Sequence, residues 1–213
     1  MENAFLIVGL GNPGAEYAKT RHNAGFSLVE KLTARWKLNW RNERKFKARV
    51  ARGEIVGRAS SPSTGGTPVP RWVLLCQPQT FMNASGEAVK AMMSFYQLPL
   101  EHLLVAVDDA DLPLGEIRLR ADGGSGGHHG LESIGRHLAT QTFARLRVGI
   151  GRKYGAREIT DYVLDRFEKA EAAVMEKVLD RAADQAECWV ADGIEMAMNR
   201  FNGSVEKANE LNE

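Results

Sequence analysis

The apolar residues of this chain fall into short runs and helix-spaced sets that alternate along most of its length. Residues 5–8 (Phe-Leu-Ile-Val) and residues 103–107 are short apolar runs, and both predict buried strands. Further strands are predicted at 46–56, 72–75, 117–120 and 146–150. Apolar residues spaced mostly three or four apart predict helices near 26–36, 88–95, 131–138 and 168–200.

This alternation predicts an α/β protein in which one three-layer α/β/α domain spans residues 1–213. Its sheet is expected to be mixed and mostly parallel, and its C-terminal segment 168–200 to be helical. Residues 57–70 are rich in Gly, Ser and Pro, which predicts a flexible loop or hairpin tip. Strand-like sequence resumes directly afterwards, so no domain boundary is expected there.

The composition is that of an ordinary globular protein. Hydrophobic residues make up 44% and charged residues 26% of the chain, which argues against disordered, collagenous and coiled-coil classes. No apolar run approaches the length of a membrane span, and the N-terminus does not have the pattern of a signal peptide. Cys76 and Cys188 are far apart and outside any disulfide or zinc motif. We therefore expect a soluble protein of the reducing cytoplasm.

The net charge of +1 conceals an asymmetry along the chain. Residues 1–155 contain 21 Lys and Arg against 13 Asp and Glu, whereas residues 156–213 contain 7 against 14. A basic body is a reason to consider a polyanionic partner. A solvated surface beside an acidic helix explains the same numbers, and charge alone favours this second interpretation.

The segment 9–14 (Gly-Leu-Gly-Asn-Pro-Gly) follows the first predicted strand and matches the G-x-G-x-x-G pattern of dinucleotide-binding loops. In such loops the glycines lead directly into a helix that holds the pyrophosphate. Here Pro13-Gly14 favours a turn, and the helical pattern begins only near Asn23. A nucleotide-dependent oxidoreductase is therefore a weak alternative. The turn instead places Asn12 at the carboxyl end of a strand, where open α/β sheets bind ligands.

His22 and Asp108 are candidates for an acid–base pair. His22 follows the glycine turn and Asp108 ends a buried strand, so the two side chains can meet at one edge of the sheet. A carboxylate bonded to one imidazole nitrogen fixes the tautomer and leaves the other nitrogen as a base. Asp109 and Asp111 add a metal-binding alternative. It is the weaker one, because both are expected to point away from the face of Asp108.

Two further segments add polar groups to this edge. Asn83 precedes a predicted helix, where it either caps the helix or donates a hydrogen bond to a developing oxyanion. Residues 123–130 contain five glycines and precede another helix, so they form either a mobile lid or a loop whose amides meet an anion. No serine lies in a nucleophile elbow and neither cysteine has a plausible base. Water activated by histidine is therefore the favoured nucleophile.

Taken together, these segments resemble the bacterial-type peptidyl-tRNA hydrolase family. The matching segments are 9–14, Tyr17, 21–25 (Arg-His-Asn-Ala-Gly), 80–83 (Thr-Phe-Met-Asn), 108–113 (Asp-Asp-Ala-Asp-Leu-Pro), 126–128 (Gly-Gly-His) and 143–151 (Phe-Ala-Arg-Leu-Arg-Val-Gly-Ile-Gly). Their order and separation extend over almost the whole chain. The resemblance implies a monomeric α/β esterase without cofactor or metal. Such enzymes cut the ester between a peptide and the 3′ ribose of tRNA, recycling tRNA from stalled or aborted translation.

The resemblance also implies roles for individual residues. His22 is the expected general base, with Asp108 orienting it, while Asn12 and Asn83 position the substrate and stabilise the tetrahedral intermediate. The substrate-binding residues implied in the same way are Tyr17, Phe81, Met82, His129, Arg120 and Arg147. Of these, the two arginines occupy positions where the family places basic residues against tRNA phosphate.

One position departs from the family pattern, because His129 follows His128 where members normally have asparagine. That asparagine is associated with holding the catalytic water. A neutral imidazole offers one donor and one acceptor, whereas a carboxamide offers two donors and an acceptor. We expect hydrolysis to be retained, with a steeper loss of activity at acid pH.

An RNA-binding protein on the same fold, of the kind that serves in organellar intron splicing, is the main alternative. The altered position 129 and the extra stretch 57–70 leave this alternative open. The intact set of catalytic residues counts against it, as does an N-terminus without the features of a transit peptide.

Overall fold

The computed structural model describes residues 4–56, 70–152 and 158–205, and a mixed eight-stranded sheet runs through them. The strand order across the sheet is β2-β3-β4-β1-β5-β7-β6-β8. In chain order the strands are β1 (Phe5–Gly9), β2 (Trp40–Glu43), β3 (Ala48–Val56), β4 (Pro70–Pro78), β5 (Leu103–Asp109), β6 (Glu116–Arg120), β7 (Ala144–Gly149) and β8 (Gly203–Ser204). The predicted α/β class is confirmed.

The four central strands, β4, β1, β5 and β7, are parallel, and their carboxyl ends meet at one edge of the sheet. β3 and β6 run antiparallel to their neighbours on either side of this group. Every residue of β1 is buried, as a strand covered on both faces requires. Because β1 lies between β4 and β5, the strand order changes direction at β1. The carboxyl ends of these strands are therefore the place where such a sheet forms a crevice for a ligand.

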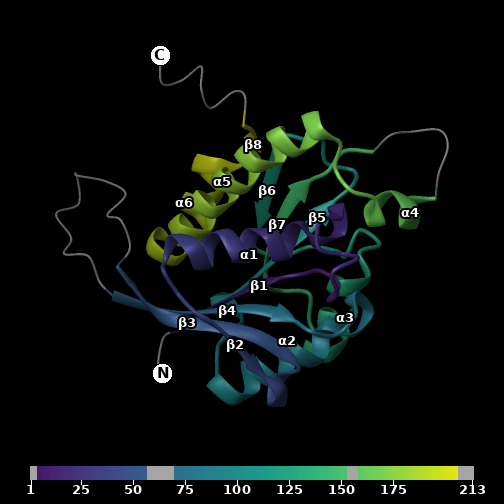
Figure 1. Ribbon diagram of the computed structural model, residues 1–213. Coiled ribbons are helices and arrows are strands. Elements are labelled where there is room, and N and C mark those ends of the chain that lie inside the picture. Colours follow the sequence, from purple (N-terminus) through teal and green to yellow (C-terminus); the bar gives the residue numbers. More distant parts are fainter. Residues whose placement is uncertain (1–3, 57–69, 153–157, 206–213) are drawn as a thin grey trace.

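Helices cover both faces of the sheet, as predicted (Figure 1). One face carries α1 (Ala24–Arg35), α5 (Lys169–Asp192) and α6 (Ile194–Phe201), and the other carries α2 (Ser85–Tyr96) and α3 (His129–Leu138). The short helix α4 (Ile159–Leu164) contacts the segment that follows the glycine turn. The described residues also form the 3₁₀ turns η1 (Arg21–Asn23), η2 (Arg44–Phe46), η4 (Met82–Ala84) and η5 (Leu100–His102).

The C-terminal segment 168–200 is helical, as predicted, but it forms two helices. The break lies at Gly193, whose φ of 87° is in the region that favours glycine. The predicted flexible stretch 57–70 lies, apart from Pro70, outside the described residues. Within the described residues, no helix combines the length and the apolar character that a membrane span requires.

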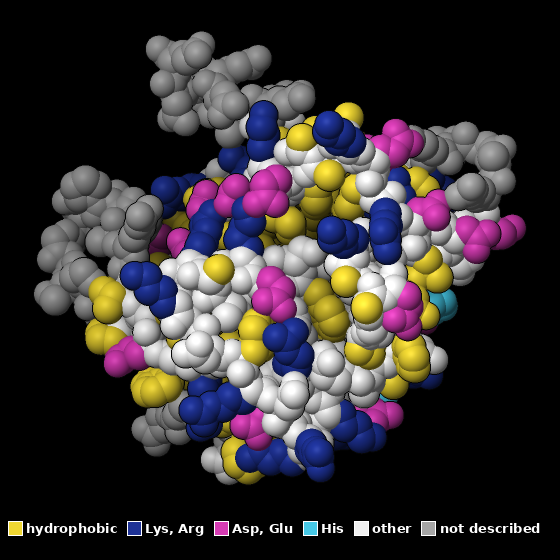
Figure 2. Space-filling view, viewed as in Figure 1, with side chains coloured by type: hydrophobic (Ala, Val, Ile, Leu, Met, Phe, Trp, Pro, Cys, Tyr) yellow, Lys and Arg dark blue, Asp and Glu magenta, His cyan; other side chains and the backbone are white. Residues whose placement is uncertain are grey.

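The charge asymmetry of the sequence is partly neutralised inside the fold. Lys31 and Arg35 of α1 form ion pairs with the acidic helix α5, at 2.8 and 2.9 Å from Asp180, and Arg35 also reaches Asp184 at 2.6 Å. Figure 2 shows Lys and Arg beside Asp and Glu where α1 and α5 lie together. Exposed pairs of this kind contribute roughly 0–1 kcal/mol each. They therefore orient α5 on α1 more than they stabilise the protein.

The close packing of α1 on the sheet generates a prediction about stability. A Cβ added at Gly25 would overlap backbone atoms of Ala106 and Leu10, whereas one added at Gly135 in α3 would meet its nearest neighbour at 3.5 Å. We expect Gly25→Ala to lower the free energy of unfolding by about 3 kcal/mol or more. Gly135→Ala is the matched control, and we expect it to be neutral or to stabilise the helix by up to about 1 kcal/mol. Urea unfolding of both variants tests this, and equal stabilities would contradict it.

Candidate functional site

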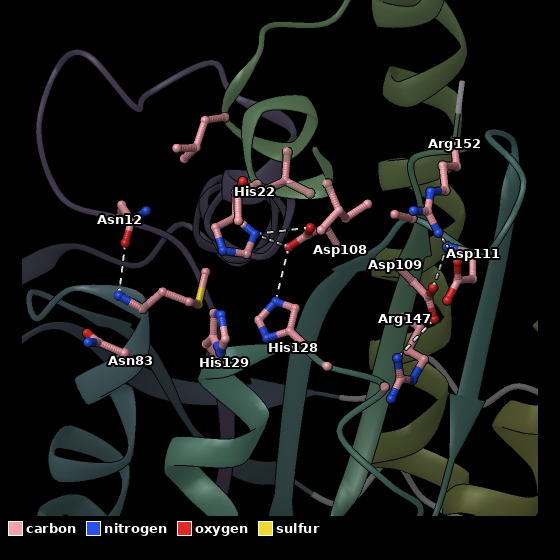
Figure 3. Close-up of a pocket in the computed structure, with 18 of the residues that line it drawn as sticks. Asn12, His22, Asn83, Asp108, Asp109, Asp111, His128, His129, Arg147 and Arg152 are labelled. Atoms are coloured by element: carbon pink, nitrogen blue, oxygen red, sulfur yellow. Dashed lines mark hydrogen bonds and ion pairs between the residues drawn. The ribbon is translucent and has the colours of Figure 1, made fainter. Parts of the chain in front are cut away.

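A cleft of about 520 Å³ opens at the carboxyl edge of the central strands (Figure 3). It is formed by segments that are far apart in the sequence: the turn after β1, η1, η4, the end of β5, the glycine-rich loop before α3, and α4. Eight of the ten predicted site residues line it, namely Asn12, His22, Phe81, Met82, Asn83, Asp108, His129 and Arg147. The sheet topology thus brings together residues from both halves of the chain.

His22 and Asp108 are in direct contact in the cleft. His22 Nδ1 lies 2.9 and 3.1 Å from the two carboxylate oxygens of Asp108. Asp108 is the last fully buried residue of β5, and its side chain is 3% exposed. An ionised carboxylate only accepts hydrogen bonds, so Nδ1 of His22 carries the proton. The other ring nitrogen, Nε2, is left with a free lone pair.

His128 is a second imidazole bonded to the same carboxylate. Its Nε2 lies 3.1 Å from Asp108 Oδ1, while its Nδ1 accepts hydrogen bonds from the backbone amides of Gly130 and Leu131 at 3.1 and 3.4 Å. Because Nδ1 faces two amide donors, the proton must be on Nε2 and is donated to Asp108. His128 therefore caps α3 and orients the carboxylate at the same time. No sequence pattern indicated this role for His128.

These contacts determine the charge of Asp108. Burial by itself raises the pKa of the Asp108 carboxyl, but hydrogen bonds from His128 and His22 and the electrostatic attraction of these rings lower it. The net pKa lies well below the usual range of a carboxyl group. Asp108 is thus an anion at neutral pH.

His22, Asp108 and His128 also have the spacing of a metal site, because their ligand atoms lie within 4.8 Å of one another. The hydrogen bonds of His128 argue against that use. A neutral imidazole that binds a metal through Nε2 carries its proton on Nδ1, and here Nδ1 faces the amide protons of Gly130 and Leu131. The donor set therefore fits proton transfer better than metal binding.

The loop after β1 presents Asn12 to the cleft in one orientation. Asn12 Oδ1 accepts a hydrogen bond from the Met82 amide at 2.9 Å, so its Nδ2 is the group left to donate. The buried side chain of Asn23 holds this loop through two hydrogen bonds to the Asn12 backbone. Its Oδ1 accepts from the Asn12 amide at 2.8 Å, and its Nδ2 donates to the Asn12 carbonyl at 3.0 Å. Asn23 directly follows His22 and fixes Asn12 beside it, a function that no sequence pattern indicated.

The remaining walls differ in polarity. Asn83 is exposed on η4 and Phe81 beside it is 60% exposed, whereas Met82 is buried. His129 is 67% exposed at the first turn of α3, and its Nδ1 lies 3.4 Å from Glu132 Oε2. Ile159, Val163 and Leu164 of α4 add an apolar wall.

Buried Arg21 joins the α4 wall to the histidine. Its guanidinium lies 2.7 Å from Glu171 Oε2 and stacks over the rings of Tyr162 and Phe167 at 4.4 and 5.2 Å. The Arg21 amide also donates to the Asp165 carbonyl at 3.0 Å. The segment that carries His22 is thus attached to the segment after α4.

The glycine-rich loop is held by two arginines. Arg145 donates to the carbonyls of Gly123 and Gly124, and Arg147 donates to those of Gly124 and Ser125. Arg147 also forms an ion pair with Asp109 at 2.9 Å. The loop therefore turns carbonyl groups towards arginines, and the first amides of α3 are taken up by His128. The amide donors that the sequence suggested for an anion are occupied here.

Two predicted site residues lie outside the cleft, and the two acids of the weaker metal-binding alternative point away from Asp108, as expected. Tyr17 lies on the loop after the glycine turn, and Arg120 is exposed on β6, so neither lines the cleft. Asp109 pairs with Arg147, while Asp111 is exposed with Arg152 at 3.8 Å. These two carboxylates do not converge on Asp108.

The arrangement is suited to a reaction in which a base activates water as the nucleophile. Cys76 is fully buried, and burial raises the pKa of its thiol above the usual range; burial likewise raises the pKa of Cys188 to about 11. Neither thiol lines the cleft, so neither is a nucleophile for it. His22 Nε2 offers a base, and amide groups lie nearby to receive negative charge.

Comparisons with known proteins agree with this geometry. Residues 6–210 match the family model described as peptidyl-tRNA hydrolase. The chain is 47% identical over 199 residues to the peptidyl-tRNA hydrolase of Chloroflexus aggregans, covering 93% of this chain and 98% of that protein. It is 44% identical over 204 residues to that of Thermosynechococcus vestitus, covering 93% of each. The crystal structure of the Acinetobacter baumannii peptidyl-tRNA hydrolase superposes with a TM-score of 0.83 at 39% identity, covering 96% of this chain and 97% of that one.

The lowered pKa of Asp108 predicts how stability depends on pH. An aspartate in the unfolded chain has a pKa of about 3.9, so the ionised Asp108 contributes stability above about pH 4 that is lost as pH falls towards its folded pKa. We expect the stability of the native protein relative to Asp108→Asn to decrease as the pH falls below about 5. Urea unfolding of both proteins from pH 7 downwards measures this. A difference that does not change with pH would contradict it.

Proposed function

The chain belongs to the peptidyl-tRNA hydrolase family, and on that premise we propose that it hydrolyses the peptide–tRNA ester with water activated by His22. The observation that carries the mechanism is the pair of hydrogen bonds from His22 Nδ1 to buried Asp108. They leave Nε2 as a base in a cleft that is lined by amide side chains. The substrate is a peptide esterified to the 3′ ribose of tRNA.

The reaction proceeds in two proton transfers. His22 Nε2 takes a proton from water, and the water oxygen attacks the ester carbonyl carbon. Asn12 Nδ2 and the Asn83 carboxamide donate hydrogen bonds to the oxyanion that forms. The imidazolium of His22 then gives its proton to the ribose 3′ oxygen as the ester bond breaks, releasing the peptide acid and tRNA. Asp108 stabilises the imidazolium between the two transfers.

His128 acts through Asp108 and is a positioning residue. The carboxylate has two oxygens, and His128 holds Oδ1 from the side of α3 while His22 bonds to both. Rotation of the carboxylate would break one of these hydrogen bonds. The Asp108 carboxylate is thus oriented, before substrate binds, to stabilise the imidazolium form of His22.

The two ends of the substrate meet different surfaces. Phe81 and Met82 lie with the apolar wall of α4 where a peptide side chain and the terminal adenosine can pack. In this proposal Arg147, in the cleft, and Arg120, exposed on β6, bind tRNA phosphates, whereas Tyr17 lies outside the cleft. The ion pair with Asp109 holds the Arg147 guanidinium in a fixed position relative to the substrate. We further propose that the protein acts in the cytoplasm without a cofactor, and that it acts as a monomer, since all proposed catalytic groups belong to one chain.

Replacement of His22 tests the mechanism. We expect His22→Ala to lower the rate of hydrolysis of an N-blocked aminoacyl-tRNA by about 10²–10⁴-fold, because the base is lost. Binding of tRNA should remain. His102→Ala is the matched control, because His102 lies at the end of β5 opposite to Asp108. This variant should retain full activity. Full turnover by His22→Ala would refute the assignment, and tRNA binding without hydrolysis by the native protein would favour the RNA-binding alternative.

His129 predicts a second, separable effect. A protonated imidazole has donors only, so protonation of His129 removes the acceptor that can hold the attacking water. Glu132 and, across the cleft, His22, His128 and Asp108 are the other titratable groups nearby. We expect the acid limb of kcat/KM to be steeper in the native protein than in His129→Asn, because two protonations rather than one inactivate it. Superimposable pH–rate profiles would contradict this role.

A further inference from the structure

Twelve residues at one edge of the sheet carry an unusual density of positive charge. Residues 41–52 contain six Lys and Arg against a single Glu, and they form β2, η2 and the start of β3. We call this set the basic tract: Arg41, Arg44, Lys45, Lys47, Arg49 and Arg52. Figure 2 shows Lys and Arg side chains over the part of the molecule where β2 and α2 lie in Figure 1.

Most of this charge is available to a partner. Arg41, Arg44 and Arg52 are exposed and have no carboxylate partner among the residues that the structure describes. Lys47 is paired with Glu87 at 2.7 Å and Arg49 with Glu30 at 3.2 Å. Cations of α1 are neutralised by carboxylates of α5, but these three arginines have no such partners among the described residues.

Lys45 differs from the arginines because aromatic rings hold it. Its ammonium lies 3.8 Å from the centre of the Phe95 ring and 4.7 Å from that of Phe46. Phe95 is 58% exposed, so the tract includes an exposed ring beside a cation. Cations interspersed with exposed aromatic rings are typical of surfaces that bind nucleic acid.

The basic tract reaches the cleft. The Gln79 amide donates to the Lys47 carbonyl at 2.7 Å, two residues before Phe81 of the cleft wall. A second hollow of about 210 Å³, lined in part by Arg49 and Gln79, adjoins the cleft at Asn12. The exposed arginines of β6 lie beyond β7, on the other side of the central strands. Cations therefore flank the site from both edges of the sheet.

We propose that the basic tract is a second RNA-binding surface, which binds the phosphate backbone of the tRNA body while the ester lies in the cleft. This inference rests on the proposed function, since it concerns the same substrate. Guanidinium groups pair with phosphate oxygens through paired donors, and such interactions add affinity without reading sequence. Their function is to hold the large RNA portion of the substrate and not to take part in the chemical step.

The basic tract has another physical explanation, which the experiment must distinguish from RNA binding. β2 is an edge strand, and charged side chains on such strands prevent pairing with other molecules. In that case the arginines protect the protein from aggregation and leave the affinity for substrate unchanged. Kinetics with substrates of different length distinguish the two explanations.

Arg41→Glu, Arg44→Glu and the double variant test the proposal. For a full-length N-blocked aminoacyl-tRNA, we expect the double variant to raise KM about tenfold or more at low salt and to leave kcat unchanged. The slope of log KM against log salt concentration should decrease by about one for each phosphate that the variant no longer neutralises. The same blocked ester on a trinucleotide with the tRNA 3′-terminal sequence should be hydrolysed equally by variant and native protein.

Lys177→Glu on α5 is the matched control, because it reverses one exposed charge outside the tract. It should leave KM and its salt dependence close to the native values. An unchanged KM in the double variant, or an equal rise in Lys177→Glu, would overturn the proposal. Because native hydrolysis of both substrates is measured first, failure of the proposed function would be seen as no hydrolysis at all, and so would be distinguished from failure of this inference.

Discussion

The site depends on one buried anion, the carboxylate of Asp108. A charge at the end of a covered strand is stable only if hydrogen-bond donors replace the water that burial removes. Here the donors are the imidazoles of His22 and His128, which come from opposite sides of the cleft. The same hydrogen bonds that stabilise the anion determine the proton position on each ring. The position of the proposed base, His22, is therefore a consequence of how the fold accommodates a buried charge.

The parts that surround this anion are held by a small number of polar interactions. Asn23 holds the Asn12 loop, Arg21 attaches α4 to the histidine segment, and Arg145 and Arg147 hold the carbonyls of the glycine-rich loop. Most of these interactions join segments that are distant in sequence. Polar side chains in these positions fix loops that have little apolar surface of their own. A site built in this way is preorganised, which is what charge stabilisation in a transition state requires.

Charge is distributed in two ways over the rest of the molecule. On one face, the cations of α1 meet the carboxylates of α5 and are used within the fold. At the β2 edge, arginines remain exposed without acidic partners among the described residues. A net charge close to zero therefore conceals exposed arginines at the β2 edge, and a substrate with a phosphate backbone suits such a surface.

The α/β class, the order of the main strands and helices, and the family could all be predicted from the sequence, because hydrophobic spacing and the motif residues are local features of the chain. The sequence also indicated His22, Asp108, Asn12 and Asn83. Four features became visible only in the folded chain: His128 shares Asp108, Asn23 holds Asn12, Arg147 is bonded to Asp109, and Gly193 divides the C-terminal helical segment. Apolar spacing reports which face of an element is buried. It does not report which polar groups of distant segments meet, because those partners are chosen by packing and by the need to satisfy each buried donor and acceptor.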